Sequence, residues 1–332
     1  MIGRITHPRR TIGRLAVATA MLCVAGLSTG AHAAEKVTYL LPAPAFLPAF
    51  GPWMLAKARG YYAEEGLEVE FKAAKGGVDV AKQVGAGNAV IGGAIGDTPI
   101  IVRANGIPVK AVAVLGGRSL MQLAVHADRN VKTPADLKGM TITTMSYQDT
   151  TYYALLGMLA ANGLSKNDVK AQAAGPAGTW KLFIADKADA MAAVPDWIGI
   201  AMGAGKKLTI IPADDHFKSM AQAILASDET IKGNPALIGK LVRATLKGMR
   251  DIMSDPDGAA KDYVAAVPQH KSKEKAMAGV FKLYNTYVYP GQVKLGAMDK
   301  DRLAGLQQFY LDNGFIRKAT ALDDLYTNQF VQ

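Results

Sequence analysis

The stretch "VDVAKQVGAGNAVIGGAIGDTPIIVRANGIPVKAVAVL", residues 78–115, decides the fold class. A helical segment that ends in glycine leads into the apolar run "AVIGGAI" (89–95), which reads as a buried strand. "TPIIVRANG" follows, with Pro99 near a helix start and Gly106 just past its end, and "VKAVAVL" (109–115) reads as another buried strand. This alternation predicts parallel strands with helices on both faces, an α/β fold.

The same rhythm continues on both sides of this stretch. Strand-like runs precede it at 37–41 and 67–71, and a second, similar unit starts near Leu120. Near residues 221–227 the rhythm changes to long helices, which look like a return into the first unit. The sequence therefore predicts two lobes, one formed by residues 35–119 plus 227–332 and the other by residues 120–226.

The first 33 residues have the composition of a secretory signal. Four arginines form a basic head, the apolar run "LAVATAMLCVAGL" follows, and Ala31-His32-Ala33 fits a signal-peptidase site. The apolar run has 13 residues, which is too short to span a bilayer as a stable helix. We therefore expect a signal peptide over residues 1–33, cleaved near Ala33, and export to the periplasm.

The composition of the mature chain excludes several classes of protein. Removing 33 of 332 residues leaves 299, and removing four arginines lowers the formal charge from +10 to +6. The one cysteine, Cys23, lies in the signal, so an exported chain of this size must be held by its cores and not by disulfides. No aromatic and basic residues interleave as in nucleic-acid-binding proteins, so we expect no nucleic-acid partner.

No strong catalytic, cofactor or metal signature is present in the mature chain. Its glycine-rich segment lacks G-x-G-x-x-G and G-K-[ST], so neither dinucleotide nor P-loop phosphate binding is predicted. His126, His216 and His270 are widely separated and lack the spacing of zinc ligands. We therefore expect no cofactor, no metal and no enzymatic activity, although a catalytic triad can assemble in space from distant residues.

The segment "MSYQDTTYYALLGML" (145–159) places many polar groups at the start of one helix. Leu155 and Leu159 recur at helical spacing, while hydroxyl, amide and carboxylate groups crowd residues 146–151. One cap is enough for a helix, and Asp149 or Thr150 could supply it. The excess predicts a site for a polar or anionic substituent, although an over-capped helix end is the alternative.

Three segments in order, after a signal peptide, carry a resemblance to a known family. They are "GPWMLAKARGYYAEEGLEVEF" (51–71), "ADLKGMTITT" (135–144) and "LFIADKADAMAAVPDW" (182–197). The chain resembles the periplasmic solute-binding proteins of ABC importers, most closely the branch with sulfonate-, taurine-, nitrate- and thiamine-pyrimidine-binding members. The resemblance implies a two-lobed clamp with two hinge crossovers, and a permease and ATPase in the inner membrane as partners. It also implies a monomer.

The family fold and a general rule agree on the position of the ligand. Open α/β sheets bind ligands beyond the carboxyl ends of their strands, and in the family the ligand lies between the lobes. The loops that follow predicted strands then supply the site. The candidate ligand-binding residues are Pro44, Phe46, Asp97, Thr98, Arg118, Ser146, Tyr147, Gln148, Asp149, Thr150, Thr151, Asp196 and Trp197.

The expected cargo is a small organic solute, anionic and with an aromatic or heteroaromatic ring. Phe46, Tyr147 and Trp197 suggest aromatic walls, and Arg118 is predicted to pair with a carboxylate or sulfonate. Asp149 would oppose an anion unless it faces away, so a cargo with an amino or ring N–H group is the alternative. Two other functions stay open, a ligand-presenting sensor domain and an exported enzyme related to pyrimidine-forming proteins of the same fold.

Overall fold

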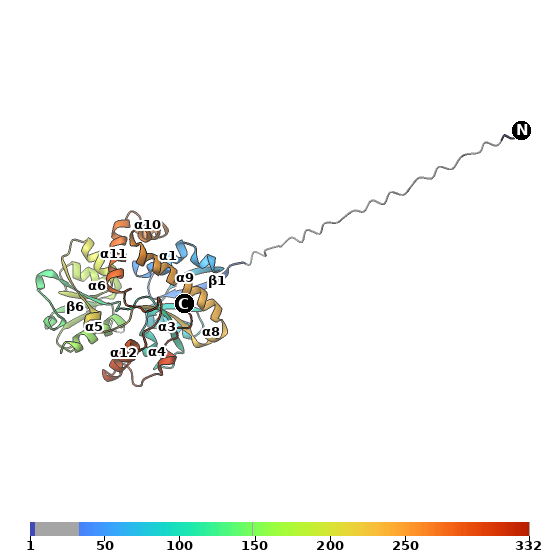
Figure 1. The fold of residues 1–332 in the computed structure, drawn as a ribbon. Helices are drawn as coiled ribbons and strands as arrows, with labels where there is room; N and C mark the ends of the chain where they lie inside the picture. Colours follow the sequence, from blue (N-terminus) through green and yellow to red (C-terminus); the bar gives the residue numbers. More distant parts are fainter. Residues whose placement is uncertain (4–32, 148, 332) are drawn as a thin grey trace. The chain divides into compact units, whose positions relative to one another are not determined.

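The computed structural model describes residues 1–3, 33–147 and 149–331 (Figure 1). The chain divides into two units, Met1–Ala33 and Ala34–Gln332. The helices and strands discussed below belong to the second unit. Most of the predicted signal peptide, and Gln148 of the predicted site, lie outside the described residues.

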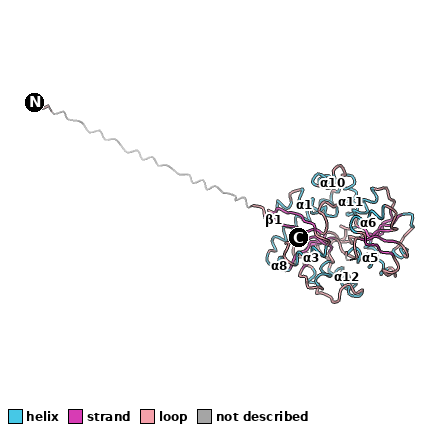
Figure 2. The backbone as a smooth tube through the Cα atoms, turned by 180° about the vertical axis from the view of Figure 1, so that it is seen from behind, coloured by secondary structure: helices cyan, strands magenta, loops and turns pink. Residues whose placement is uncertain are grey.

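The strands form two five-stranded sheets, which lie apart in the second unit (Figure 2). Sheet A has the order β2-β1-β3-β10-β4 and sheet B the order β7-β6-β8-β5-β9. Helices flank both sheets, so the predicted α/β, two-lobed architecture is confirmed. The strands are β1 (Glu35–Leu41), β2 (Leu67–Ala73), β3 (Ile91–Ile95), β4 (Val109–Val114), β5 (Gln122–His126), β6 (Thr141–Thr144), β7 (Lys170–Ala173), β8 (Ala190–Ala193), β9 (Leu208–Pro212) and β10 (Gln222–Ser227).

Each sheet contains one strand that runs against its neighbours. β10 is antiparallel to both β3 and β4, and β5 is antiparallel to both β8 and β9. The remaining pairs, such as β1 with β2 and β6 with β7, are parallel, as the alternation of helix and strand predicts. β5 and β10 are the first strands after the chain passes from one sheet to the other. A helical crossover does not set their direction, so the local pattern could not predict it.

Helices pack on both sheets and on one another. The predicted helix from Trp53 to Tyr62 is two helices, because Gly60 between them has a φ of 76°. α9 buries the predicted apolar stripe, whose members Leu241 and Met249 are fully enclosed. The α-helices are α1 (Gly51–Ala58), α2 (Tyr61–Glu64), α3 (Gly77–Gly85), α4 (Thr98–Arg103), α5 (Thr150–Ala161), α6 (Gly175–Ile184), α7 (Pro195–Gly203), α8 (Asp228–Gly233), α9 (Pro235–Ser254), α10 (Pro256–Ala266), α11 (Glu274–Tyr287), α12 (Lys300–Asp312) and α13 (Leu322–Leu325).

The C-terminal helices contact elements that belong to sheet B. α11 packs against α7, where the ideal Cβ position of Gly199 would lie 2.6 Å from a methyl group of Val280. After α12, the ring of Phe315 stacks on Tyr153 of α5 with centroids 5.0 Å apart. Long-range packing of this kind holds the two sheets in one arrangement.

Arg302 of α12 connects the two segments that pass between the sheets. Its Nε donates to the backbone oxygen of Ser219 at 2.6 Å, and its guanidinium pairs with Asp214. Ser119, from the other crossing segment, donates its N–H to Asp214 Oδ1 at 2.8 Å. The side chains of Arg302 and Asp214 are only 8% and 17% exposed. This charge pair therefore ties both crossing segments to one helix.

Candidate functional site

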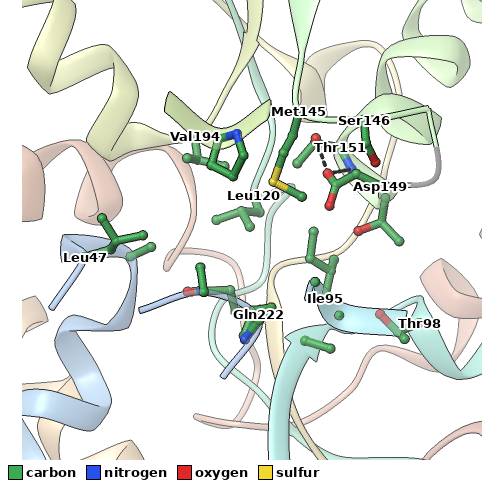
Figure 3. A pocket seen from close by; sticks show the side chains of 18 of the residues that line it. Leu47, Ile95, Thr98, Leu120, Met145, Ser146, Asp149, Thr151, Val194 and Gln222 are labelled. Carbon is green, nitrogen blue, oxygen red and sulfur yellow. Dashed lines mark hydrogen bonds between the residues drawn. The ribbon is translucent and has the colours of Figure 1, made fainter. Parts of the chain in front are cut away.

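A cavity lies between the two sheets and draws its lining from both (Figure 3). Its volume is about 1060 Å³ when the open solvent at its mouth is included. The lining residues are Pro42, Ala43, Leu47, Ala49, Phe50, Lys75, Gly76, Gly77, Val78, Ala94, Ile95, Thr98, Leu120, Met145, Ser146, Asp149, Thr150, Thr151, Pro176, Val194, Asp196, Trp197 and Gln222.

The ends of parallel strands position most of this lining. The loops after β1 and β3 contribute from sheet A, and the loops after β6 and β8 contribute from sheet B. All four loops follow the carboxyl ends of their strands, where the dipoles and free N–H groups of the next helices also point. The cavity therefore occupies the place where open α/β sheets bind ligands.

Apolar side chains form most of the wall. Phe50 is 3% exposed and Trp197 is 8% exposed, and both aromatic residues line the cavity. Pro195 begins α7 directly after β8, so Trp197 sits in the first turn of that helix. Leu47, Met145 and Val194 complete an apolar surface that suits a flat, largely apolar ring (Figure 3).

Asp149 has two roles at the start of α5. Its Oδ1 accepts hydrogen bonds from the N–H of Thr151 at 2.9 Å and from the hydroxyl of Thr151, so it is the N-cap of the helix. Its Oδ2 has no hydrogen-bonding partner among residues 33–147 and 149–331, and the carboxylate lines the cavity (Figure 3). Burial raises the pKa of Asp149, against the hydrogen bonds from Thr151. The capping group thus also offers an acceptor to the cavity.

Gln222 is a polar residue on the sheet A side of the cavity, where Thr98 and Lys75 also line it. It is the first residue of β10 and pairs with Ile95 of β3, so its backbone is fixed in the middle of the sheet. The residue is only 6% exposed, yet within the described part of the chain its carboxamide makes no hydrogen bond. Figure 3 shows Gln222 and Asp149 on different sides of the cavity.

Two further carboxyl groups are almost fully buried near the cavity. Burial raises the pKa of Asp196 to about 6, although Tyr284 donates a hydrogen bond to its Oδ1 at 3.4 Å. Burial raises the pKa of Asp97 to about 7, against a hydrogen bond from the hydroxyl of Tyr310. Asp196 lines the cavity and Asp97 does not. Both groups favour their neutral form more than an exposed carboxyl does.

The cavity brings together seven of the residues predicted from the sequence. They are Thr98, Ser146, Asp149, Thr150, Thr151, Asp196 and Trp197. They come from three segments, the loop after β3 on sheet A and the loops after β6 and β8 on sheet B. Whether they bind a ligand stays a prediction.

Five predicted residues lie outside the lining. Arg118 is exposed and donates from Nη1 to the backbone oxygen of Thr286 at 3.4 Å, so its predicted pairing with a cargo anion has no geometric support. Phe46 is 37% exposed, and its backbone oxygen accepts a hydrogen bond from the Tyr263 hydroxyl at 2.5 Å. Tyr147 is 52% exposed, and its hydroxyl donates to Ala171 O at 3.0 Å. The others are Pro44, which is exposed, and Asp97, which lies behind the wall.

Sequence reasoning missed several lining residues. Phe50, Met145 and Gln222 are the most informative of them. Phe50 lies four residues after Phe46, which was predicted from the loop after β1, and Met145 directly precedes the polar residues 146–151. Gln222 had a detectable signal, since it is a polar residue at the start of the otherwise apolar strand "AQAILAS" (221–227).

The described residues contain neither a cluster of metal ligands nor a helix that could span a membrane. Outside positions 4–32, 148 and 332, no three His, Cys, Asp or Glu side chains gather as a metal site would require. Within the same residues, no helix combines the length and apolar composition needed to cross a bilayer.

Known proteins resemble this chain over most of its length. RibY, a riboflavin-binding protein of Chloroflexus aurantiacus, is 29% identical over 297 residues, which span 85% of this chain and 82% of RibY. THI11 of Saccharomyces cerevisiae, a 4-amino-5-hydroxymethyl-2-methylpyrimidine phosphate synthase, is 24% identical over 261 residues, 71% of this chain and 72% of THI11. Both a binding protein and an enzyme are therefore related to this chain.

A solved structure confirms the fold. The alkanesulfonate-binding protein SsuA of Xanthomonas axonopodis, bound to MOPS, has a TM-score of 0.68 to this structure at 17% sequence identity. The match covers 90% of this chain and 99% of that protein. At this identity the likeness shows the two-lobed fold of periplasmic binding proteins and not a shared ligand. Residues 47–259 match the family described as NMT1/THI5 like, so the chain belongs to the NMT1/THI5-like family.

Proposed function

We propose that the chain is the extracytoplasmic solute-binding component of an ABC importer. In this role it captures a small heteroaromatic solute between lobes formed by residues 35–119 plus 227–332 and 120–226. It works in the periplasm as a monomer, after loss of residues 1–33, and delivers the solute to a permease and ATPase in the inner membrane. One observation carries the proposal. The cavity is walled by loops from both sheets, so closure of the lobes would enclose a ligand.

The chemistry of the lining supports a flat ring with hydrogen-bonding edges. Phe50 and Trp197 supply aromatic wall, while Gln222 and Asp149 supply polar groups. Asp149 and Asp196 make an aliphatic anion a poor cargo at this position, because a carboxylate repels it. Lys75 is the one basic lining residue in the described part of the chain, and it is exposed. The riboflavin named for RibY is a ring of this kind.

Native mass spectrometry of the full chain, purified without added solute, tests the proposal. We expect a co-purified small molecule, and we expect the same molecule to raise the melting temperature on adding it back. A ligand at a hundredfold excess over its dissociation constant stabilises the folded state by about 2.7 kcal/mol. A panel of riboflavin, aminopyrimidines, aliphatic sulfonates and nitrate that leaves the melting temperature unchanged would contradict a cargo role.

An exported enzyme is the second candidate, favoured by the relationship to THI11. The two functions differ in the fate of the bound molecule. Incubation with the co-purified solute, followed by mass spectrometry of the solution, should return it unchanged from a binding protein. A stoichiometric or catalytic change in its mass would favour the enzyme.

A further inference from the structure

The carboxamide of Gln222 is a buried polar group without a partner in an apolar cavity. The residue is 6% exposed, and it makes no hydrogen bond to residues 33–147 or 149–331. A buried amide normally finds partners, because removing its N–H and C=O groups from water without replacement is unfavourable. The amide atoms of Gln222 are not among the buried polar atoms closed off from solvent, so they are open to the cavity, where a ligand that displaces solvent would have to bond them.

A second buried glutamine shows what a satisfied carboxamide looks like in this fold. Gln307 is 7% exposed, its Nε2 donates to Thr320 O at 2.9 Å, and its Oε1 accepts from Thr320 N at 2.9 Å. Both the donor and the acceptor of that amide are used by the backbone of one residue, Thr320. Gln222 has the same burial and offers the same donor and acceptor pair, but toward the cavity (Figure 3).

We propose that Gln222 determines specificity by binding a ring edge that carries an N–H donor next to an acceptor. This inference rests on the proposed solute-binding function and names its substrate class, neutral lactam, imide or amino-azine heterocycles. The carboxamide would donate Nε2–H to the ring acceptor and accept the ring N–H at Oε1, the pairing that Gln307 makes with Thr320.

The surroundings of Gln222 are consistent with a role in binding the edge of a ring. Its strand lies in the middle of sheet A, and the N–H of Leu115 donates to its backbone oxygen at 2.6 Å, so the amide projects from a rigid element. From the opposite sheet, Asp149 Oδ2 offers an acceptor for a second N–H of the same ring. The carboxylate of Asp149 disfavours a carboxylate or sulfonate head, whereas Gln222 selects for the donor and acceptor pattern of the ring edge.

The experiment compares two buried glutamines and two pairs of ligands. Calorimetry measures binding of riboflavin and of riboflavin methylated on its imide nitrogen to the wild-type chain, Gln222→Met and Gln307→Met. A parallel arm uses 4-amino-2-methylpyrimidine and its N,N-dimethyl analogue, and MOPS serves as the aliphatic sulfonate. Thermal melting of each ligand-free protein reports stability.

We expect methylation to weaken binding to the wild type by about 10-fold or more, since a site built to bond an N–H rejects an analogue without it. Gln222→Met should lose a similar factor for the unmethylated ligand, lose the discrimination, and keep the melting temperature. Gln307→Met should lower the melting temperature and keep the discrimination. This contrast separates a ligand contact from a structural amide.

The remaining outcomes overturn one proposal or both. Equal binding of methylated and unmethylated ligands, or discrimination that survives Gln222→Met, overturns the role of Gln222 while the solute-binding function stands. Binding of MOPS alone does the same. Failure of every probe to bind overturns this inference together with the proposed heteroaromatic cargo.

Discussion

The charge pair between Arg302 and Asp214 should make a large contribution to the stability of the ligand-free protein. Removing one partner of a buried pair costs about 3–5 kcal/mol, because the other charge is left without compensation. Arg302→Met also removes the hydrogen bond to Ser219 O, which places its effect at the upper part of this range. Asp214→Asn keeps an acceptor for the Ser119 N–H but leaves the buried Arg302 guanidinium without its counter-charge, so it should also cost about 3–5 kcal/mol, toward the lower part of that range.

Urea unfolding followed by circular dichroism at pH 7 measures these effects. The double variant should be less destabilised than the sum of the single ones by at least about 1.5 kcal/mol, because neither charge is then left alone. Arg118→Ala is the matched control, since Arg118 is exposed and, among the described residues, makes one long hydrogen bond. It should change stability by about 0.5 kcal/mol or less. A loss below about 1 kcal/mol for Arg302→Met, or strict additivity of the two changes, would refute the reasoning.

Three other predictions follow from described contacts. The pKa of Asp97 is raised to about 7 in the fold, so its contribution to stability is lost as pH rises from about 4 through 7. Between pH 4 and 8 in urea titrations, the free energy of unfolding of Asp97→Asn should therefore rise relative to that of the wild type by on the order of 3 kcal/mol. Parallel curves for the two proteins would contradict this. Gly157→Ala should destabilise the protein by roughly 1–3 kcal/mol, since the added Cβ would lie 2.3 Å from the ring of Phe217. Gly305→Ala, where the added Cβ meets open space, should stabilise it by roughly 0.4–1 kcal/mol. Equal shifts in the melting temperatures of the two variants would be inconsistent with the packing. Trp197→Ala should weaken riboflavin binding by roughly 10-fold or more, and Trp197→Phe by less, because the phenyl ring keeps part of the aromatic wall. An unchanged dissociation constant for both variants would exclude Trp197 as part of that wall.

Local sequence patterns predicted the helices and strands because buried apolar residues repeat along the chain with the period of the element that contains them. The run 89–95 and the stripe containing Leu241 and Met249 are buried as expected. Patterns could not show that Gly60 divides a helix or that β10 enters sheet A antiparallel, since both depend on backbone geometry and on distant neighbours.

The site was predictable at the level of loops and less so at the level of side chains. The rule that ligands bind beyond strand ends found the loops of Thr98, Asp149 and Trp197. It could not show that Asp97, beside Thr98, turns away to accept a hydrogen bond from Tyr310, 213 positions later in the chain. Gln222 was missed for the same reason, since nothing local marks a polar residue in a strand as an unpaired one.

The insertion of β10 between β3 and β4 has a consequence for the order of folding. Sheet A has a gap between β3 and the edge strand β4 until residues 222–227 arrive, although its other four strands all precede residue 115. The N-terminal part of the chain can form the β2-β1-β3 ribbon early, but β4 has no partner in the sheet until the whole of sheet B has emerged. Closing so long a loop is slow, and the open edges of β3 and β4 meanwhile can pair with other chains. Truncations that end before Gln222 should therefore aggregate, while those that end after Ser227 retain a complete sheet A.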